Sequence, residues 1–143
     1  MILILNGPNL NLLGKRQPEI YGDAPFESCL SRLREIFPES SIEYMQSNHE
    51  GVLIDAIQKY GFDSDCRGII LNAGGYTHTS VAIADAVAAI PAPVAEVHIS
   101  NIYAREAFRH SSLIAPVAAI HISGAGLKGY ELALRYLLEQ HKQ

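Results

Sequence analysis

Residues 67–90 read RGIILNAGGYTHTSVAIADAVAAI and contain one complete strand-and-helix unit. The first part, Arg67–Asn72, is a short apolar run, which is typical of a strand that is buried on both faces of a sheet. The last part, Thr77–Ile90, predicts a helix with Thr77 as its N-cap and Pro91 directly after its end. A buried strand followed by a helix is the repeating unit of α/β proteins.

The same unit repeats along the rest of the chain. Short apolar runs predict four further strands, at Ile2–Leu5, Ile42–Met45, Pro93–Ile99 and Pro116–Ser123. Amphipathic stretches predict three further helices, at Phe26–Phe37, Val52–Tyr60 and Gly129–Gln140. Strands that alternate with helices favour a parallel sheet with right-handed crossovers. The expected fold is therefore α/β: a flavodoxin-like, three-layer domain with a five-stranded parallel sheet.

Length and composition predict a single globular domain, residues 1–143. Hydrophobic residues make up 48% of the chain and charged residues 18%, which is the balance of a folded protein. The formal net charge of −4 argues against a nucleic-acid partner. No apolar run approaches the roughly 18 residues that cross a membrane, and MILILNG lacks the features of a signal peptide. We expect a cytoplasmic protein without a membrane partner, in which Cys29 and Cys66 are reduced thiols.

Polar residues gather directly after the predicted strands. In a doubly wound sheet the ligand lies at the carboxyl ends of the strands. The segments that begin there are rich in Asn, Ser, Gly and His; they are residues 6–9, 46–49, 72–78, 98–101 and 123–126. A set of purely structural loops would look similar, but so many amides and imidazoles at one edge favour a polar small-molecule site.

Two glycine-rich motifs resemble phosphate-binding loops but lack required parts. After Gly14-Lys15, Arg16 stands where a phosphate loop needs Ser or Thr, and the spacing from Gly7 is wrong. GAGLKG, residues 124–129, matches G-x-G-x-x-G, but no second strand or acidic residue follows it at the distance that a dinucleotide site needs. We interpret it as a tight strand-to-helix turn, with anion binding at the helix N-terminus as the less favoured alternative.

The histidines do not have the spacing of metal ligands, so no metal site is expected. His78 and His98 fall at the polar edge, and for these two a structural and a catalytic role are equally open. His121 lies late in a predicted strand, where a structural role is favoured over a reactive one.

Cationic residues of this acidic protein gather at the same edge. Lys15 and Arg16 lie in one of its loops, and Arg105 and Arg109 lie in another. The last two are four residues apart in YAREAFRH, so they would share one face if this segment is helical. Ordinary surface charge is the alternative, but the clustering favours a small anionic substrate, either a carboxylate or a phosphate.

Four segments together carry a family resemblance: NGPNLNLLGKRQPEIYG, QSNHEG, LNAGGYTHTSVAIADA and EVHISNIYAREAFRHSS. In this order and spacing the chain resembles the type II 3-dehydroquinate dehydratases (type II dehydroquinases) over essentially its whole length. The resemblance implies a hydro-lyase that removes water from 3-dehydroquinate to give 3-dehydroshikimate, by trans elimination through an enolate, in the shikimate pathway to chorismate and the aromatic amino acids. It also implies a flavodoxin-like subunit, a homododecamer built as a tetramer of trimers, and no metal or organic cofactor.

The resemblance also implies which residues remove the proton. Tyr21 matches the catalytic base, Arg16 matches the lid arginine that activates it, and Arg105 matches a second arginine nearby. Asn9 matches the residue that holds a water against the enolate oxygen. A tyrosine with a pKa of about 10 is ionised in only about one molecule in a thousand at pH 7, and a neighbouring guanidinium favours the anion. We therefore interpret residues 7–22 as a catalytic loop with a lid.

The resemblance implies further roles at the leaving group and around the substrate. His98 matches the general acid and Glu96 its orienting neighbour; two positions apart on a strand, both side chains face the same side. The remaining matches bind substrate: Asn72, His78 and Arg109 at its hydroxyls, and the backbone amides of Ile99 and Ser100 with the Ser100 hydroxyl at its carboxylate.

Some features stand apart from this pattern or leave alternatives open. Asp85 matches a residue that reaches the site of a neighbouring subunit, and the chain departs from the commoner family pattern at Tyr103, at Ala107 and in HISGAGLKG, residues 121–129. One alternative is a non-enzymatic flavodoxin-like module, such as a flavin or nucleotide carrier or a signalling receiver. Another is a hydro-lyase or isomerase that acts on a different cyclic acid. A lysine Schiff base is not favoured, because no lysine lies within a predicted strand.

Overall fold

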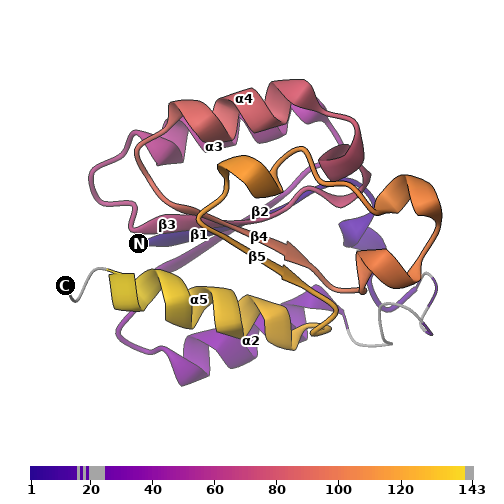
Figure 1. Ribbon diagram of the computed structural model, residues 1–143. Helices are drawn as coiled ribbons and strands as arrows, with labels where there is room; N and C mark the ends of the chain where they lie inside the picture. The colour runs from indigo at the N-terminus through magenta and orange to yellow at the C-terminus, as the bar shows by residue number, and fades with distance from the viewer. Residues whose placement is uncertain (16, 18, 20–24, 141–143) are drawn as a thin grey trace.

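Five parallel strands form the central layer of the molecule. The computed structural model describes residues 1–15, 17, 19 and 25–140. The strands lie in the order β2-β1-β3-β4-β5, and each neighbouring pair is parallel. Their bounds are β1 (Ile2–Asn6), β2 (Ile42–Gln46), β3 (Gly68–Asn72), β4 (Val94–His98) and β5 (Ile120–Ser123). Figure 1 shows them as a twisted sheet between two layers of helices.

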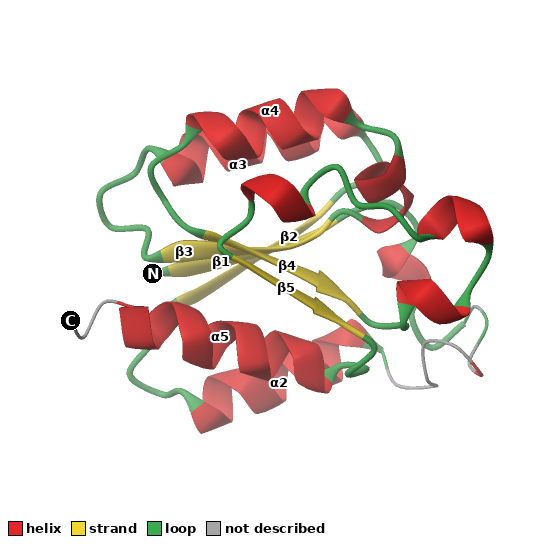
Figure 2. Ribbon diagram, viewed as in Figure 1, coloured by secondary structure: helices red, strands yellow, loops and turns green. Residues whose placement is uncertain are grey.

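The helices cover both faces of the sheet. The pair α3 (Glu50–Gly61) and α4 (Val81–Ala89) lies on one face, and the pair α2 (Phe26–Ile36) and α5 (Lys128–Gln140) lies on the other (Figures 1 and 2). This is the flavodoxin-like, three-layer α/β arrangement, so the fold class expected from the sequence is confirmed. Among the described residues, no helix combines the length and the apolar character needed to cross a membrane.

The alternation of side chains along β1 explains why both of its faces need cover. All five residues of this strand are buried. Ile2 and Ile4 belong to the core that includes residues of α2 and α5, whereas Leu3 and Leu5 belong to the core that includes residues of α3 and α4. Successive side chains of a strand point to opposite faces, so a continuous apolar run fills two cores at once.

The strand order opens a crevice at the carboxyl ends of β1 and β3. The chain runs from β1 outward to β2, and then crosses back to β3 on the other side of β1. The connections therefore leave the centre of the sheet in opposite directions. Ligands of open α/β sheets bind at such a switch point, where the loops separate.

The third helix begins later than the sequence predicts. Residues Gly74–His78 form a 3₁₀ segment, η2, and α4 starts at Val81. The N-cap is Ser80, whose side-chain oxygen accepts a backbone hydrogen bond from the first turn at 2.9 Å. The prediction that Thr77 caps this helix is wrong, because the Thr77 hydroxyl is buried and donates to Glu96 at 2.8 Å.

The predicted fifth strand also starts too early. β5 begins at Ile120, and Pro116 lies in the 3₁₀ segment η5 (Ala115–Val117). Proline has no amide hydrogen to donate to a neighbouring strand, which explains why the strand begins after it.

Residues 99–119 join β4 to β5 without an α-helix. Besides η5 they contain two short 3₁₀ segments, η3 (Ile102–Ala104) and η4 (Ala107–Arg109). The sequence predicts that Arg105 and Arg109 share a face only if this segment is helical, and the structure does not meet that condition. Figure 1 shows this connection, in orange, passing along the carboxyl ends of the strands, and this path carries both arginines to the crevice.

Candidate active site

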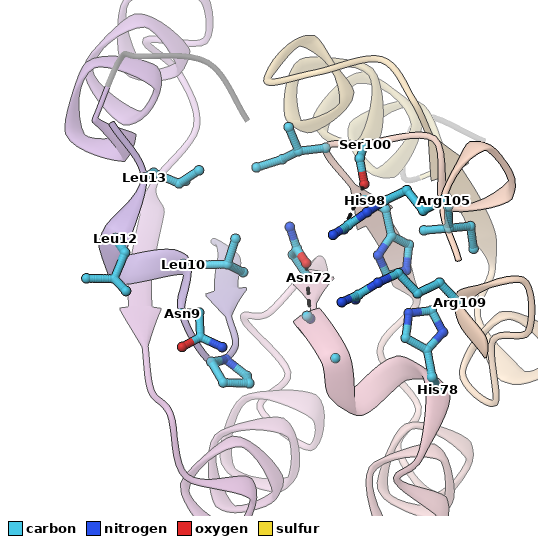
Figure 3. Close-up of a pocket in the computed structure, with 15 residues that line it drawn as sticks. Asn9, Leu10, Leu12, Leu13, Asn72, His78, His98, Ser100, Arg105 and Arg109 are labelled. Atoms are coloured by element: carbon cyan, nitrogen blue, oxygen red, sulfur yellow. Dashed lines mark hydrogen bonds between the residues drawn. The ribbon is translucent and has the colours of Figure 1, made fainter. Parts of the chain in front are cut away.

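A cavity of about 130 Å³ opens at the carboxyl ends of β1, β3 and β4. Figure 3 shows Asn9 and three leucines on one side, and imidazole and guanidinium groups on the other. The lining residues are Pro8, Asn9, Leu10, Leu12, Leu13, Asn72, Gly74, Gly75, His78, His98, Ile99, Ser100, Ile102, Arg105 and Arg109. The cavity lies where the strand order predicts a ligand site.

Asn9, on the first wall, has a backbone conformation that few residue types accept. Its φ is 69°, in the left-handed region, where Asn is enriched over other non-glycine residues. The backbone N–H of Asn9 donates to Asn48 Oδ1 at 3.0 Å. Gln46 Nε2 donates to the same oxygen and to the Gly7 carbonyl, each at 3.1 Å. Gln46, at the end of β2, and Asn48, just after it, therefore support the turn that presents Asn9.

Asn72 enters the cavity from the end of β3 and is fixed by a buried hydrogen-bond chain. Its Nδ2 donates to the Tyr130 hydroxyl at 2.9 Å, and that hydroxyl donates to Asn6 Oδ1 at 2.8 Å. The Gly74 amide donates to Asn72 Oδ1 at 3.2 Å. Burial raises the pKa of Tyr130 well above its usual value, so this hydroxyl keeps its proton and the chain keeps its direction.

His98, at the end of β4, pairs with a fully buried carboxylate. Its Nε2 lies 2.7 Å from Glu96 Oε1. Burial by itself raises the pKa of Glu96, but hydrogen bonds from His98, Ser112 and His121 outweigh it and lower the pKa to about 2. Glu96 is therefore an anion behind the imidazole. The short contact uses Nε2, so Nδ1 is the nitrogen that His98 has left for a ligand.

His78 lies beside His98, and a backbone contact determines its tautomer. The two ring centres are 6.3 Å apart. His78 Nδ1 lies 2.7 Å from the Ser111 carbonyl oxygen, which can only accept a hydrogen bond. Nδ1 therefore carries a proton, and neutral His78 offers an unprotonated Nε2 as an acceptor for a hydroxyl group.

Arginine side chains give one wall of the cavity a positive charge. Arg109 Nε donates to Glu106 Oε2 at 2.8 Å, and Arg105 Nε lies 3.8 Å from the same oxygen. One carboxylate thus faces two guanidinium groups. Arg105 Nη1 also donates to Ser100 Oγ at 3.5 Å, which connects this wall to the end of β4. The net positive charge suits a small anion.

Comparison with known proteins identifies the family. The family model described as Dehydroquinase class II matches residues 1–138. The chain belongs to the class II dehydroquinase family. A protein from an Exiguobacterium species named 3-dehydroquinate dehydratase is 55% identical over 139 residues, which cover 96% of this chain and 94% of that protein. A type II dehydroquinase structure from Butyrivibrio crossotus is 46% identical, with a TM-score of 0.89 and 96% of each chain covered. Another, from Propionibacterium acnes, is 42% identical, with a TM-score of 0.89 and coverage of 96% and 95%.

The site residues that the dehydroquinase resemblance predicts fall into three groups. Those that line the cavity are Asn9, Asn72, His78, His98, Ile99, Ser100, Arg105 and Arg109. Glu96 lies behind His98, and Asp85 is exposed on α4, outside the cavity lining. Arg16 and Tyr21 lie outside the described residues, so their roles stay predictions.

Several residues that line this cavity or contact Glu96 are not among those that the sequence singled out for the site. Leu10, Leu12 and Leu13 form an apolar wall beside Asn9, and their spacing along η1 (Leu10–Leu12) resembles ordinary core packing. Thr77 and Ser112 donate to Glu96, yet they come from distant segments of the chain. No spacing within the chain pairs these residues with Glu96, because the fold alone brings the three together.

One group in the described chain also meets the distance requirement for a metal. Potential ligand atoms of Glu96, His98 and His121 all lie within 4.8 Å of one another. A search of sequence spacing does not find this group, because His121 comes from the neighbouring strand. The short contacts join imidazole nitrogens to carboxylate oxygens at 2.7 and 2.8 Å, so the group forms a hydrogen-bonded network.

Proposed function

We propose that this cavity is the active site of a type II 3-dehydroquinate dehydratase, a hydro-lyase that converts 3-dehydroquinate to 3-dehydroshikimate in the shikimate pathway to chorismate and the aromatic amino acids. Family membership over residues 1–138, and a relative named 3-dehydroquinate dehydratase at 55% identity, support the activity. The observation that carries the assignment to this cavity is the buried contact of 2.7 Å between Glu96 and His98.

His98 and Glu96 supply what the second half of this elimination requires. Hydroxide is a poor leaving group, so the departing oxygen needs a proton from a general acid. The ionised Glu96 stabilises positive charge on the His98 ring, and Nδ1 of that ring is left for the substrate. His98 donates this proton as the carbon–oxygen bond breaks, and the product leaves with water.

The first half removes a proton next to the ketone and forms an enolate. Tyr21 acts as the base, and Arg16 and Arg105 favour its anion. Asn9 holds a water against the enolate oxygen, where a preorganised donor contributes a few kcal/mol, or about 10²–10³ in rate. Arg105 and Asn9 line the cavity, which supports these two roles.

The remaining polar residues of the cavity bind the substrate. The backbone amides of Ile99 and Ser100, with the Ser100 hydroxyl, receive its carboxylate beside the cationic wall. The substrate hydroxyls contact Asn72, His78 and Arg109. The unprotonated Nε2 of neutral His78 suits a hydroxyl donor.

We also propose how the domain assembles and in which compartment it acts. Residues 1–143 form a single flavodoxin-like catalytic domain, which acts in the cytoplasm without a metal or organic cofactor. The domain assembles as a homododecamer, a tetramer of trimers, in which Asp85 reaches the site of a neighbouring subunit. Large exposed apolar side chains support subunit contacts, since Phe108 is 68% exposed and Tyr103 is 62% exposed. Light scattering of the purified protein measures the number of subunits.

A spectroscopic assay tests the function directly. The product is a conjugated enone, so 3-dehydroquinate added to chelator-treated protein should produce a rise in ultraviolet absorbance. A folded protein that gives no rise with 3-dehydroquinate overturns the substrate assignment. Turnover of a different cyclic hydroxy-keto acid would then identify another hydro-lyase, and binding without turnover would favour a ligand-binding module.

A further inference from the structure

His121 contacts the catalytic pair but has no role in the mechanism above. It lies on β5, directly opposite Glu96 in the register of the β4–β5 pair. Its neighbours on the strand, Ile120 and Ile122, pack against the core that includes residues of α2 and α5. Alternate side chains of a strand point to opposite faces, so His121 is directed to the face that carries Glu96.

The two oxygens of the Glu96 carboxylate have different partners. Oε1 accepts hydrogen bonds from His98 at 2.7 Å, Thr77 at 2.8 Å and Ser112 at 2.6 Å. Oε2 accepts one from His121 Nδ1 at 2.8 Å, and within the described part of the chain no other donor reaches it. Because Glu96 is fully buried, loss of His121 would leave an anionic oxygen without a partner.

This contact also indicates where the protons of His121 lie. A carboxylate oxygen only accepts, so Nδ1 carries a proton. The Nε2 atom is buried and has no hydrogen-bond partner among the described residues. A proton there would create an unsatisfied buried donor on a cation whose ring centre is 5.5 Å from that of His98. The hydrogen bond to Glu96 needs only the proton on Nδ1.

We infer that His121 is a positioning residue for the elimination and acts on the acid His98 through Glu96. By holding Oε2 it fixes the plane of the carboxylate, and this keeps Oε1 aligned with His98 Nε2. His98 Nδ1 then stays directed to the leaving hydroxyl. The inference rests on the proposed function. It gives a role to a residue of HISGAGLKG, where this chain departs from the commoner family pattern.

Two substitutions separate the hydrogen bond of His121 from its volume. In His121→Asn the side-chain amide can still donate to Glu96, whereas His121→Val has no donor. We expect kcat with 3-dehydroquinate to fall about tenfold or more in His121→Val, because a buried acceptor of the acid pair loses its partner. KM should change by less than about threefold, since His121 does not line the cavity. His121→Asn should recover kcat to within about threefold of the wild type.

A matched control and a pH profile distinguish positioning from general stability. Ile120→Ala removes apolar contacts from the same strand on the opposite face, so it should lower Tm but leave kcat unchanged.

Loss of the donor raises the pKa of Glu96 in His121→Val, so the acid limb of kcat should move to higher pH. The profiles of His121→Asn and Ile120→Ala should match the wild type. Among the described residues that line the cavity, the other titratable or charged groups stay the same in all variants; they are His78, Arg105 and Arg109.

Nitrogen NMR of ¹⁵N-histidine-labelled wild type gives a readout that does not require His121→Val to fold. The imidazole missing from the His121→Asn spectrum should have a protonated Nδ1. A His121 whose Nδ1 carries no proton overturns the inference, as does a folded His121→Val with wild-type kcat and pH profile, or a His121→Asn as impaired as His121→Val. A wild type without dehydratase activity overturns the proposed function instead.

Discussion

At the scale of single residues, a buried charge in this protein is stabilised by hydrogen bonds. Glu96 has no exposed surface, yet its pKa is about 2, because donors around the carboxylate outweigh the effect of burial. Glu96→Gln preserves the shape but removes the charge and turns one acceptor into a donor. We expect kcat to fall by about 10²-fold or more, as for loss of a general acid, with little change in KM. Steady-state kinetics check this, and a wild-type kcat would contradict the acid pair.

Tyr21 belongs to the same scale, although it lies outside the described residues. Phenylalanine has no group that can accept the proton next to the ketone. Tyr21→Phe should therefore lower kcat by about 10²–10⁴-fold. Binding of 3-dehydroquinate, measured by calorimetry, should be largely retained. Tyr60→Phe, on α3, is the control and should keep wild-type kcat. Full activity in Tyr21→Phe would contradict the assignment of Tyr21 as the base.

At the scale of elements, the loops after β1 and β3 meet at Gly7. Its amide donates to the Asn72 carbonyl at 2.7 Å, and a Cβ at this position would lie 2.6 Å from the Ala73 carbonyl oxygen. Gly7→Ala should force these loops apart, destabilise the fold by about 1–3 kcal/mol and lower kcat, because Asn9 moves with its loop. Thermal unfolding and steady-state kinetics measure both effects.

Gly51→Ala is the matched control for this prediction. A Cβ at Gly51 would have no atom within 4 Å, and the residue lies in the first turn of α3. This substitution should stabilise the protein by about 0.4–1 kcal/mol and leave kcat unchanged. If the two alanine variants behave alike, the close approach at Gly7 has no effect on the site.

At the scale of the whole molecule, Glu96 makes the free energy of unfolding depend on pH. Its pKa is about 2 in the folded protein and 4.5 ordinarily, so folding favours the ionised form. This stabilisation, roughly 3 kcal/mol, is present above the ordinary pKa and is lost as the pH falls toward the folded value. Denaturant titrations at one protein concentration should show the wild type and Glu96→Gln converging between about pH 5 and about pH 2. A difference that does not vary with pH would contradict this.

The sequence predicts most of the fold because the signals for strands and helices are local. The apolar run of β1 and the helical period of α2 depend only on near neighbours, and the handedness of the crossovers limits the topology. The predicted start of α4 at Thr77 is wrong, because the Thr77 hydroxyl donates to the Glu96 carboxylate on β4. The sequence leaves open whether residues 99–119 contain a helix; the structure has only 3₁₀ segments there, and both arginines of that connection line the cavity.

The residues of the candidate site also divide into those that local sequence signals predict and those that only the fold brings together. Motifs along the chain point to residues such as Asn9, Asn72 and His98, because strand ends of a parallel sheet share one edge and the family pattern marks them. No motif connects Glu96 to His121, which lies 25 positions away. Their contact depends on the register between β4 and β5. The alternation of side chains within each strand decides which face Glu96 and His121 occupy, and only the assembled sheet decides that they lie opposite each other.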